Sequence, residues 1–176
     1  TVVAFGCSMA VCSVSMYLTH YAERYQIANI GVFFTISAAA MIAARLLTSK
    51  FSDRFGVLVS LIPGYTLLAA ALFLLPLLVR QPLVLYPAAL IYGFGQGMAA
   101  PAVQAAAVRS APEERRSSAS STFLLSGDLA FIAGPVLWGR CIEKLDHMAA
   151  FRLAGVLVLL SLLFACLCLR ERKPRT

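Results

Sequence analysis

The sequence has 176 residues, of which 60% are hydrophobic and 13% are charged, and its mean hydropathy is +0.82. A soluble domain of this length would have more apolar surface than its core could bury, so the composition favours the lipid bilayer. The formal net charge of +7 is typical of some nucleic-acid binders, but these cations lie in short gaps between apolar runs. We therefore expect no nucleic-acid partner.

Six apolar segments follow one another, each close to the roughly 20 residues that cross about 30 Å of hydrocarbon. We expect spans at 2–19, 27–47, 57–79, 83–108, 119–138 and 149–169, and a basic tail at 170–176. The segments are continuously apolar and do not alternate, which favours helices over a β-barrel. The predicted fold is an all-α membrane protein, with one bundle of six transmembrane helices over residues 1–169.

The first span, 2–19, has Gly6, Ser13 and Tyr17 on one helical face. We expect this face to line a polar cavity, with Ser13 and Tyr17 as candidate lining residues. The alternative is local, because a serine can bond to its own helix and a tyrosine near the membrane boundary is often interfacial.

The second span, 27–47, ends in a charged stretch, "RLLTSKFSDRFG", from Arg45 to Gly56. Asp53 can accept hydrogen bonds from a helix N-terminus or pair with Arg45 or Arg54, and Gly56 lets the chain turn sharply. Contacts that break in one conformation and form in another suit a gate. The alternative is a solvated loop whose cations only follow membrane orientation rules.

The third and sixth spans contain no internal charge and few polar groups, so we expect both to face lipid. The fourth span instead carries polar residues that are candidates for lining a cavity: Tyr92, Gln96 and Gln104. For the two glutamines the alternative is hydrogen bonding between helices, which contributes about 0.6 kcal/mol per bond.

The fifth span, 119–138, carries a stripe of small residues. Ser120, Gly127 and Gly134 are seven residues apart and share one helical face. Two helix backbones can approach closely along such a face, so we expect a helix contact there, with Pro135 beside it.

Asp128 is the one acidic residue that we place deep inside a span. A charge at the centre of a membrane helix costs about 2.5–3.5 kcal/mol, so Asp128 should face protein or water. A desolvated carboxyl group suits proton uptake and release, whereas a nearby cation such as Arg45 would make it a structural partner. Both roles remain open for Asp128.

Lysine and arginine residues are unequally divided between the two sides of the predicted bundle. One side has Arg45, Lys50, Arg54, Arg109, Arg115, Arg116, Arg170, Arg172, Lys173 and Arg175. The other side has Arg24, Arg80, Arg140, Lys144 and Arg152. By the positive-inside rule the richer side is cytoplasmic, and both chain ends lie there.

The five cysteines and two histidines show neither paired metal-ligand spacing nor a catalytic cluster. Four of the cysteines lie inside apolar spans, where they are small packing residues: Cys7, Cys12, Cys166 and Cys168. We predict no metal, no cofactor and no enzymatic activity.

The segment "SKFSDRFG" resembles the loop motif of the major facilitator superfamily, Gly-x-Leu-Ser/Ala-Asp-Arg-x-Gly-Arg-Lys. Asp53, Arg54 and Gly56 match this motif, whereas Ser49 replaces its first glycine and the two trailing cations are missing. Two further stretches are similar to members of that family, "YGFGQGMAAP" in the fourth span and "SGDLAFIAGPVLWG" in the fifth, which resembles a Gly-Pro antiporter motif. The chain as a whole resembles the carboxy-terminal six-helix half of such a transporter.

The resemblance implies two three-helix repeats, with the first and fourth helices along the substrate path and the second and fifth against another half. It also implies secondary transport of a small organic solute, inward or as efflux, by alternating access. Asp128 would then serve proton coupling, and Arg45, Asp53, Arg54 and Gly56 the gate. One half cannot alternate access alone, so the partner is an amino-terminal half or a second copy, and Thr1 in place of methionine hints at a fragment.

The implied location is the bacterial cytoplasmic membrane, as a multi-pass protein in contact with the lipid bilayer. A non-transporting membrane subunit that binds a partner through the small-residue helix face is the alternative function. A membrane enzyme ranks third.

Overall fold

The computed structural model describes residues 2–27, 29–55 and 57–171. For residues 48–55 and 169–171 it describes the backbone alone. The six long helices are α1 (Val2–Arg24), α2 (Ile30–Phe55), α3 (Leu58–Leu74), α4 (Leu85–Arg109), α5 (Arg116–Lys144) and α6 (His147–Glu171). Three short 3-10 helices are η1 (Leu75–Val79), η2 (Pro82–Val84) and η3 (Glu113–Arg115). Six segments of the described chain are long and apolar enough to cross a membrane, which confirms the predicted all-α fold.

Several helices run beyond the spans expected from hydropathy. α2 continues through residues 48–55, where we expected a loop, and α5 continues to Lys144. Hydropathy marks the part of a helix that crosses hydrocarbon, whereas backbone hydrogen bonds continue through charged residues until a breaker such as glycine or proline. Residues 48–55 contain neither glycine nor proline, so the charged stretch belongs to α2.

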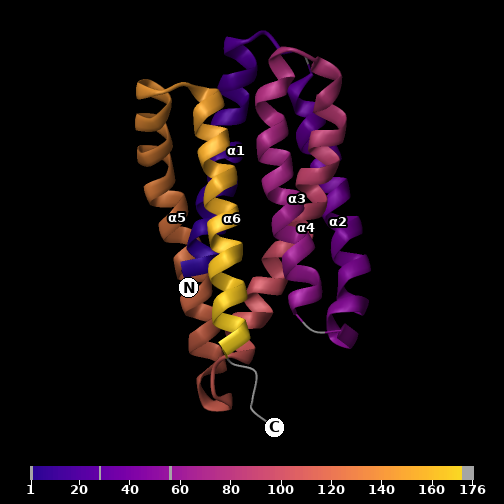
Figure 1. Cartoon of the computed structure of the whole chain (residues 1–176), viewed down its shortest axis with the longest axis vertical. Coiled ribbons are helices and arrows are strands. Elements are labelled where there is room, and N and C mark those ends of the chain that lie inside the picture. Colours follow the sequence, from indigo (N-terminus) through magenta and orange to yellow (C-terminus); the bar gives the residue numbers. More distant parts are fainter. Residues whose placement is uncertain (1, 28, 56, 172–176) are drawn as a thin grey trace.

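The bundle consists of two three-helix repeats that exchange their first helices. α4 packs mainly against α2 and α3 of the first repeat, whereas α1 packs mainly against α5 and α6 of the second. α3 and α6 also pack together, and Figure 1 shows them side by side, with α2 and α5 at the two edges. Each repeat therefore depends on the other for its core.

Glycines let α4 approach two helices at once. A Cβ on Gly97 would lie 2.7 Å from the Met41 carbonyl oxygen of α2, and one on Gly95 would lie 2.5 Å from the Leu68 nitrogen of α3. No side chain fits at such distances from a neighbouring backbone. The glycine run of α4 therefore serves close packing between helices.

The uncharged sequence of the third span suggested that this helix faces lipid. In the structure only part of the α3 surface is exposed. One face is fully buried, at Tyr65, Leu68 and Leu72, and the helix packs mainly against α4 and α6. The other face exposes Val59 and Ile62. Apolar side chains suit lipid and protein neighbours equally, so hydropathy alone does not distinguish the two environments.

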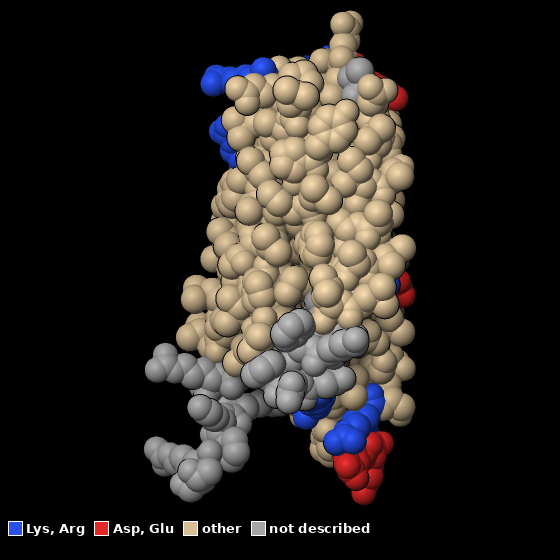
Figure 2. All heavy atoms as spheres, turned by 90° about the vertical axis from the view of Figure 1, so that its right-hand side faces the viewer, with Lys and Arg blue, Asp and Glu red and all other residues tan. Residues whose placement is uncertain are grey.

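Figure 2 shows charged side chains gathered near the two ends of the molecule, with a broad and almost uncharged band between them. This distribution matches a protein whose middle lies in hydrocarbon. Among the six helices, α2 and α5 are the least buried within the chain. These two helices therefore offer the largest surface to lipid or to another protein segment.

Candidate functional site

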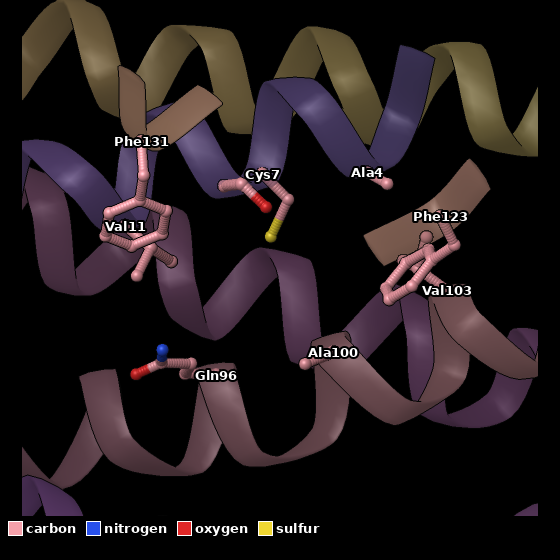
Figure 3. A pocket seen from close by; sticks show the side chains of 9 residues that line it. Ala4, Cys7, Val11, Gln96, Ala100, Val103, Phe123 and Phe131 are labelled. Carbon is pink, nitrogen blue, oxygen red and sulfur yellow. The ribbon is translucent and has the colours of Figure 1, made fainter. Parts of the chain in front are cut away.

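A cavity of about 160 Å³ lies between α1, α4 and α5 (Figure 3). It is lined by Ala4, Cys7, Ser8, Val11, Gln96, Ala100, Val103, Phe123 and Phe131. Most of these side chains are apolar, and the polar groups are the Gln96 amide, the Ser8 hydroxyl and the Cys7 thiol. Figure 3 shows Gln96 of α4 and Cys7 of α1 pointing into the space from opposite walls. An apolar chamber with few polar groups is typical of small-molecule sites.

Gln96 is the one member of this wall among the five residues that we expected to line a cavity. Tyr92 is instead buried in the core, with its ring centroid 5.6 Å from that of Phe33 on α2. Gln104 is half-buried two turns beyond Gln96 and lies outside the cavity wall.

The cavity lies on the face of α1 opposite to the one expected from the polar residues. Ser13 is buried and donates a hydrogen bond to the Ala10 carbonyl of its own helix, at 2.7 Å. Gly6, on the same face, packs against the Ser161 side chain of α6. The small and polar residues on this face make contacts within and between helices, so they do not mark a water-filled cavity.

Sequence reasoning missed most of the cavity wall. Four of the missed residues repeat at three- and four-residue intervals along α1: Ala4, Cys7, Ser8 and Val11. That spacing predicts one helical face, but it does not tell a cavity from a packed contact. The two phenylalanines of α5 gave no signal at all, because an aromatic side chain in a membrane span also suits lipid.

α1 and α5 also meet in a close contact that we call the α1–α5 seam. Its members are Met9, Cys12, Tyr17, Gly134, Pro135 and Trp138. The Tyr17 hydroxyl donates to the Pro135 carbonyl at 2.6 Å, and the buried Trp138 Nε1–H donates to the Met9 carbonyl at 2.8 Å. Tyr17 therefore joins α1 to α5 and does not line the cavity.

The small-residue stripe of α5 faces α1. A Cβ on Gly134 would lie 2.5 Å from Cys12 Sγ, whereas one on Gly127 would meet only Ser8 Oγ, at 3.5 Å. Ser120 is half-buried near the start of the helix. The part of this stripe around Gly134 is thus covered by the chain itself.

Asp128 lies on the exposed face of α5. It points away from the buried stripe formed by Ser126, Ala130, Gly134 and Trp138. Within the described part of the chain, its carboxylate has no hydrogen bond or ion pair. The expectation that protein or water surrounds this group therefore stays a prediction.

The charged end of α2 is described only in part. Arg45 is exposed, and the backbone at Asp53 and Arg54 is helical, but the side chains of these two residues lie outside the described part. Gly56 lies outside the described residues altogether. The contacts expected of a gate therefore stay a prediction.

A larger hollow of about 790 Å³ follows the outer side of α5. It is lined by residues of α5, including Ile132, Val136, Arg140 and Lys144, and by Leu145, which follows the helix. Because one side of a single helix forms it, this hollow is an open surface groove, unlike the cavity beside Gln96.

In the described residues, no group of three or more His, Cys, Asp or Glu side chains could hold a metal ion. The sequence profile of the Major Facilitator Superfamily matches residues 1–176. None of the curated proteins compared matches the chain. The profile match agrees with the six spanning helices and the two exchanged repeats. The chain therefore belongs to the major facilitator superfamily and is a multi-pass membrane protein of this transporter type.

Proposed function

We propose that this chain is one six-helix half of a secondary transporter that moves a small organic solute by alternating access. The observation that carries the proposal is the cavity of about 160 Å³ with Gln96 in its wall. Small-molecule sites usually measure about 300–1,000 Å³, so this cavity has the size of part of a site. In transporters of this architecture the site lies between two halves that rock against each other.

A second half would cover the surface formed by α2 and α5. These are the least buried helices of the chain, and α5 also borders the cavity. Asp128 lies exposed on α5, where a carboxylate in contact with lipid would be costly. An amino-terminal half or a second copy of the chain would supply the missing protein or water contact, and by resemblance this chain is the carboxy-terminal half.

The proposed gate is the charged end of α2, with Arg45, Asp53, Arg54 and Gly56. Proton coupling is assigned to Asp128, because an ionisable group inside a membrane protein marks a relay or a substrate path. Protonation would remove the charge of Asp128 and so change the cost of covering it. The two roles are separate, since the gate lies at the end of α2 and Asp128 lies within α5.

By the distribution of cations, the end of the bundle where α6 ends is cytoplasmic. In a cysteine-free background, a cysteine at Glu143 should react with an impermeant thiol reagent added outside intact cells. A cysteine at Glu114 should not react. Labelling in the reverse order would overturn this orientation in the bacterial cytoplasmic membrane.

The alternative, a non-transporting subunit that binds a partner through the small-residue face of α5, is less well supported. Around Gly134 that face already packs against Cys12 of α1. Such a subunit would need a different surface for its partner.

Two glutamines on α4 make a matched test of the transport proposal. The chain and its second half are reconstituted into vesicles with a pH gradient, and organic solutes are screened for those that collapse it. For an active solute, Gln96→Ala should raise the half-saturating concentration about fivefold or more, the loss of about one hydrogen bond. Gln104→Ala, outside the cavity wall, should leave it unchanged. Equal effects of the two substitutions would refute the role of the cavity.

A further inference from the structure

His147 is buried at the end of the bundle where α1 ends and α6 begins, which we call the distal end. Its exposed fraction is 7%, and its ring centroid lies 6.0 Å from that of the fully buried Tyr21. In the described residues its Nδ1 is a buried polar atom without a hydrogen-bond partner. The nearby Asp146 Oδ1 is 3.7 Å away, beyond hydrogen-bond range.

Asp146 holds this end together from the turn between α5 and α6. Its backbone has φ 137°, a region that side-chain-bearing residues rarely adopt and that stores strain. The Tyr25 hydroxyl donates to Asp146 Oδ2 at 3.1 Å. Partial burial raises the pKa of the Asp146 carboxyl, but bonds from the His147 backbone N–H and from Tyr25, together with the nearby imidazole, outweigh it and lower the pKa. Asp146 is therefore charged at neutral pH.

The same cluster joins a third element of the fold. The Tyr21 hydroxyl is 3.3 Å from the Pro76 carbonyl of η1, and the Tyr21 ring packs edge-on against Phe151 of α6. Four residues thus connect α1, α6 and η1 at this end. We call them the distal cluster: Tyr21, Tyr25, Asp146 and His147. Opening the distal end would have to break these contacts.

Charging His147 in this packed arrangement would be unfavourable. Burial would desolvate the imidazolium beside the Tyr21 ring, and the Asp146 carboxylate, 3.7 Å away and bonded to Tyr25, offsets this cost only in part. The other charged or titratable groups that act on it from α1 are Arg24 and His20, which carry or gain the same sign of charge. η1 presents only backbone carbonyls to Tyr21 in this cluster. Water would solvate the imidazolium if the helices separated.

We propose that His147 is a proton-binding site that opens the distal end: acid favours a state in which α1 and α6 separate there and His147 is protonated in water. The reason is linkage, because a conformation that binds the proton more tightly gains population as pH falls. The inference concerns the packing of one end of the bundle, so it does not rest on the proposed transport function.

The two histidines of the printed sequence provide the first test. The chain is labelled with ¹⁵N-histidine in lipid nanodiscs, and the His20→Gln variant assigns the signals. The His147 signals should change on acidification, and the signals of a ¹³C-labelled Tyr21 ring should shift with the same midpoint. Titration of His147 without movement of Tyr21 would overturn the proposal.

A second test measures opening directly. In a background without native cysteines, Ala150→Cys reports a position 2% exposed one turn from His147, and Leu145→Cys is an exposed reference at 62%. Both variants react with a water-soluble thiol reagent, and the ratio of the two reaction rates is measured. In this ratio the pH dependence of the thiol–reagent reaction itself cancels. Between about pH 7.5 and about pH 5 this ratio should rise several-fold, because the state with separated helices binds the proton more tightly.

Two histidine variants decide whether His147 causes that rise. His147→Gln should keep the ratio flat with pH, whereas His20→Gln, on the exposed surface of the same end, should behave as the parent chain. A flat ratio in the parent, or an unchanged rise in His147→Gln, contradicts the proposal. If His147→Gln does not fold, the titration of the unmodified chain still decides the outcome.

Discussion

Gly134 in the α1–α5 seam should not tolerate even one added carbon. A Cβ at this position would lie 2.5 Å from Cys12 Sγ and 3.2 Å from Cys12 Cβ. Real Cβ atoms do not approach heavy atoms to 2.5 Å, so Gly134→Ala must push α5 away from α1 or move Cys12. Gly127→Ala is the matched control on the same helix, because its Cβ would meet only Ser8 Oγ at an ordinary 3.5 Å.

The expected magnitude follows from the difference between these two variants. Overpacking a tight contact costs about 1–3 kcal/mol. Replacing glycine by alanine within a helix stabilises the helix by about 1 kcal/mol, and both variants gain this amount. The propensity gain therefore cancels, and Gly134→Ala should be less stable than Gly127→Ala by about 1–3 kcal/mol. Adding Cys12→Ala removes the nearest atom and should restore at least half of this loss.

Trp138 is the one tryptophan of the sequence and a member of the seam, so its fluorescence reports the contact directly. Unfolding free energies are measured by SDS titration in mixed micelles for the two single variants and for the double variant with Cys12→Ala. Equal stabilities for Gly134→Ala and Gly127→Ala would refute the tight contact. A Cys12→Ala substitution that restores nothing would show that the clash lies elsewhere.

Two further predictions concern charged residues. Asp53→Asn in the complete transporter should slow transport several-fold while membrane abundance stays unchanged, since the charge acts on a conformational equilibrium. Equal transport rates for variant and parent would show that the charged end of α2 is an ordinary helix end and not a gate. The pKa of the Asp146 carboxyl is lower in the folded chain than its value of about 3.9 in the unfolded chain. The carboxylate therefore stabilises the fold above about pH 3.9, and this contribution is lost as the pH falls through the lower, folded pKa. The SDS-unfolding free energy should therefore decrease on acidification below about pH 4 in the parent and less in Asp146→Asn, and parallel pH curves would contradict the assignment.

The six helices could be predicted from the sequence because membrane insertion is decided by local composition. A run of about 20 apolar residues spans the bilayer whatever its neighbours are. The stripe through Gly127 and Gly134 was equally local, since residues seven apart share a face in any helix, and Gly134 does lie against α1. What the spacing did not tell was the partner helix or how closely each glycine approaches it.

The face of α1 could not be predicted, because two of the three residues that suggested a polar path have partners that are far away in sequence. Tyr17 bonds to Pro135, and Gly6 makes room for Ser161. Such contacts exist only after α5 and α6 have packed, so the same residues in the sequence suggested a water-lined path. The distal cluster was hidden for the same reason, since Tyr25 and Asp146 are separated by most of the chain.

The Gln96 amide and the Asp128 carboxylate have no hydrogen-bond partner among the described residues. The Gln96 amide faces a mostly apolar wall, and the Asp128 carboxylate lies on the exposed face of α5. At membrane depth an unsatisfied amide costs about 1–3 kcal/mol and a charge costs more, so neither group would persist against lipid. Both costs vanish if a second half brings hydrogen-bond donors or water to the surface between α2 and α5. We therefore expect the covering half to present polar groups to Gln96 and Asp128, which would place the solute between the two halves.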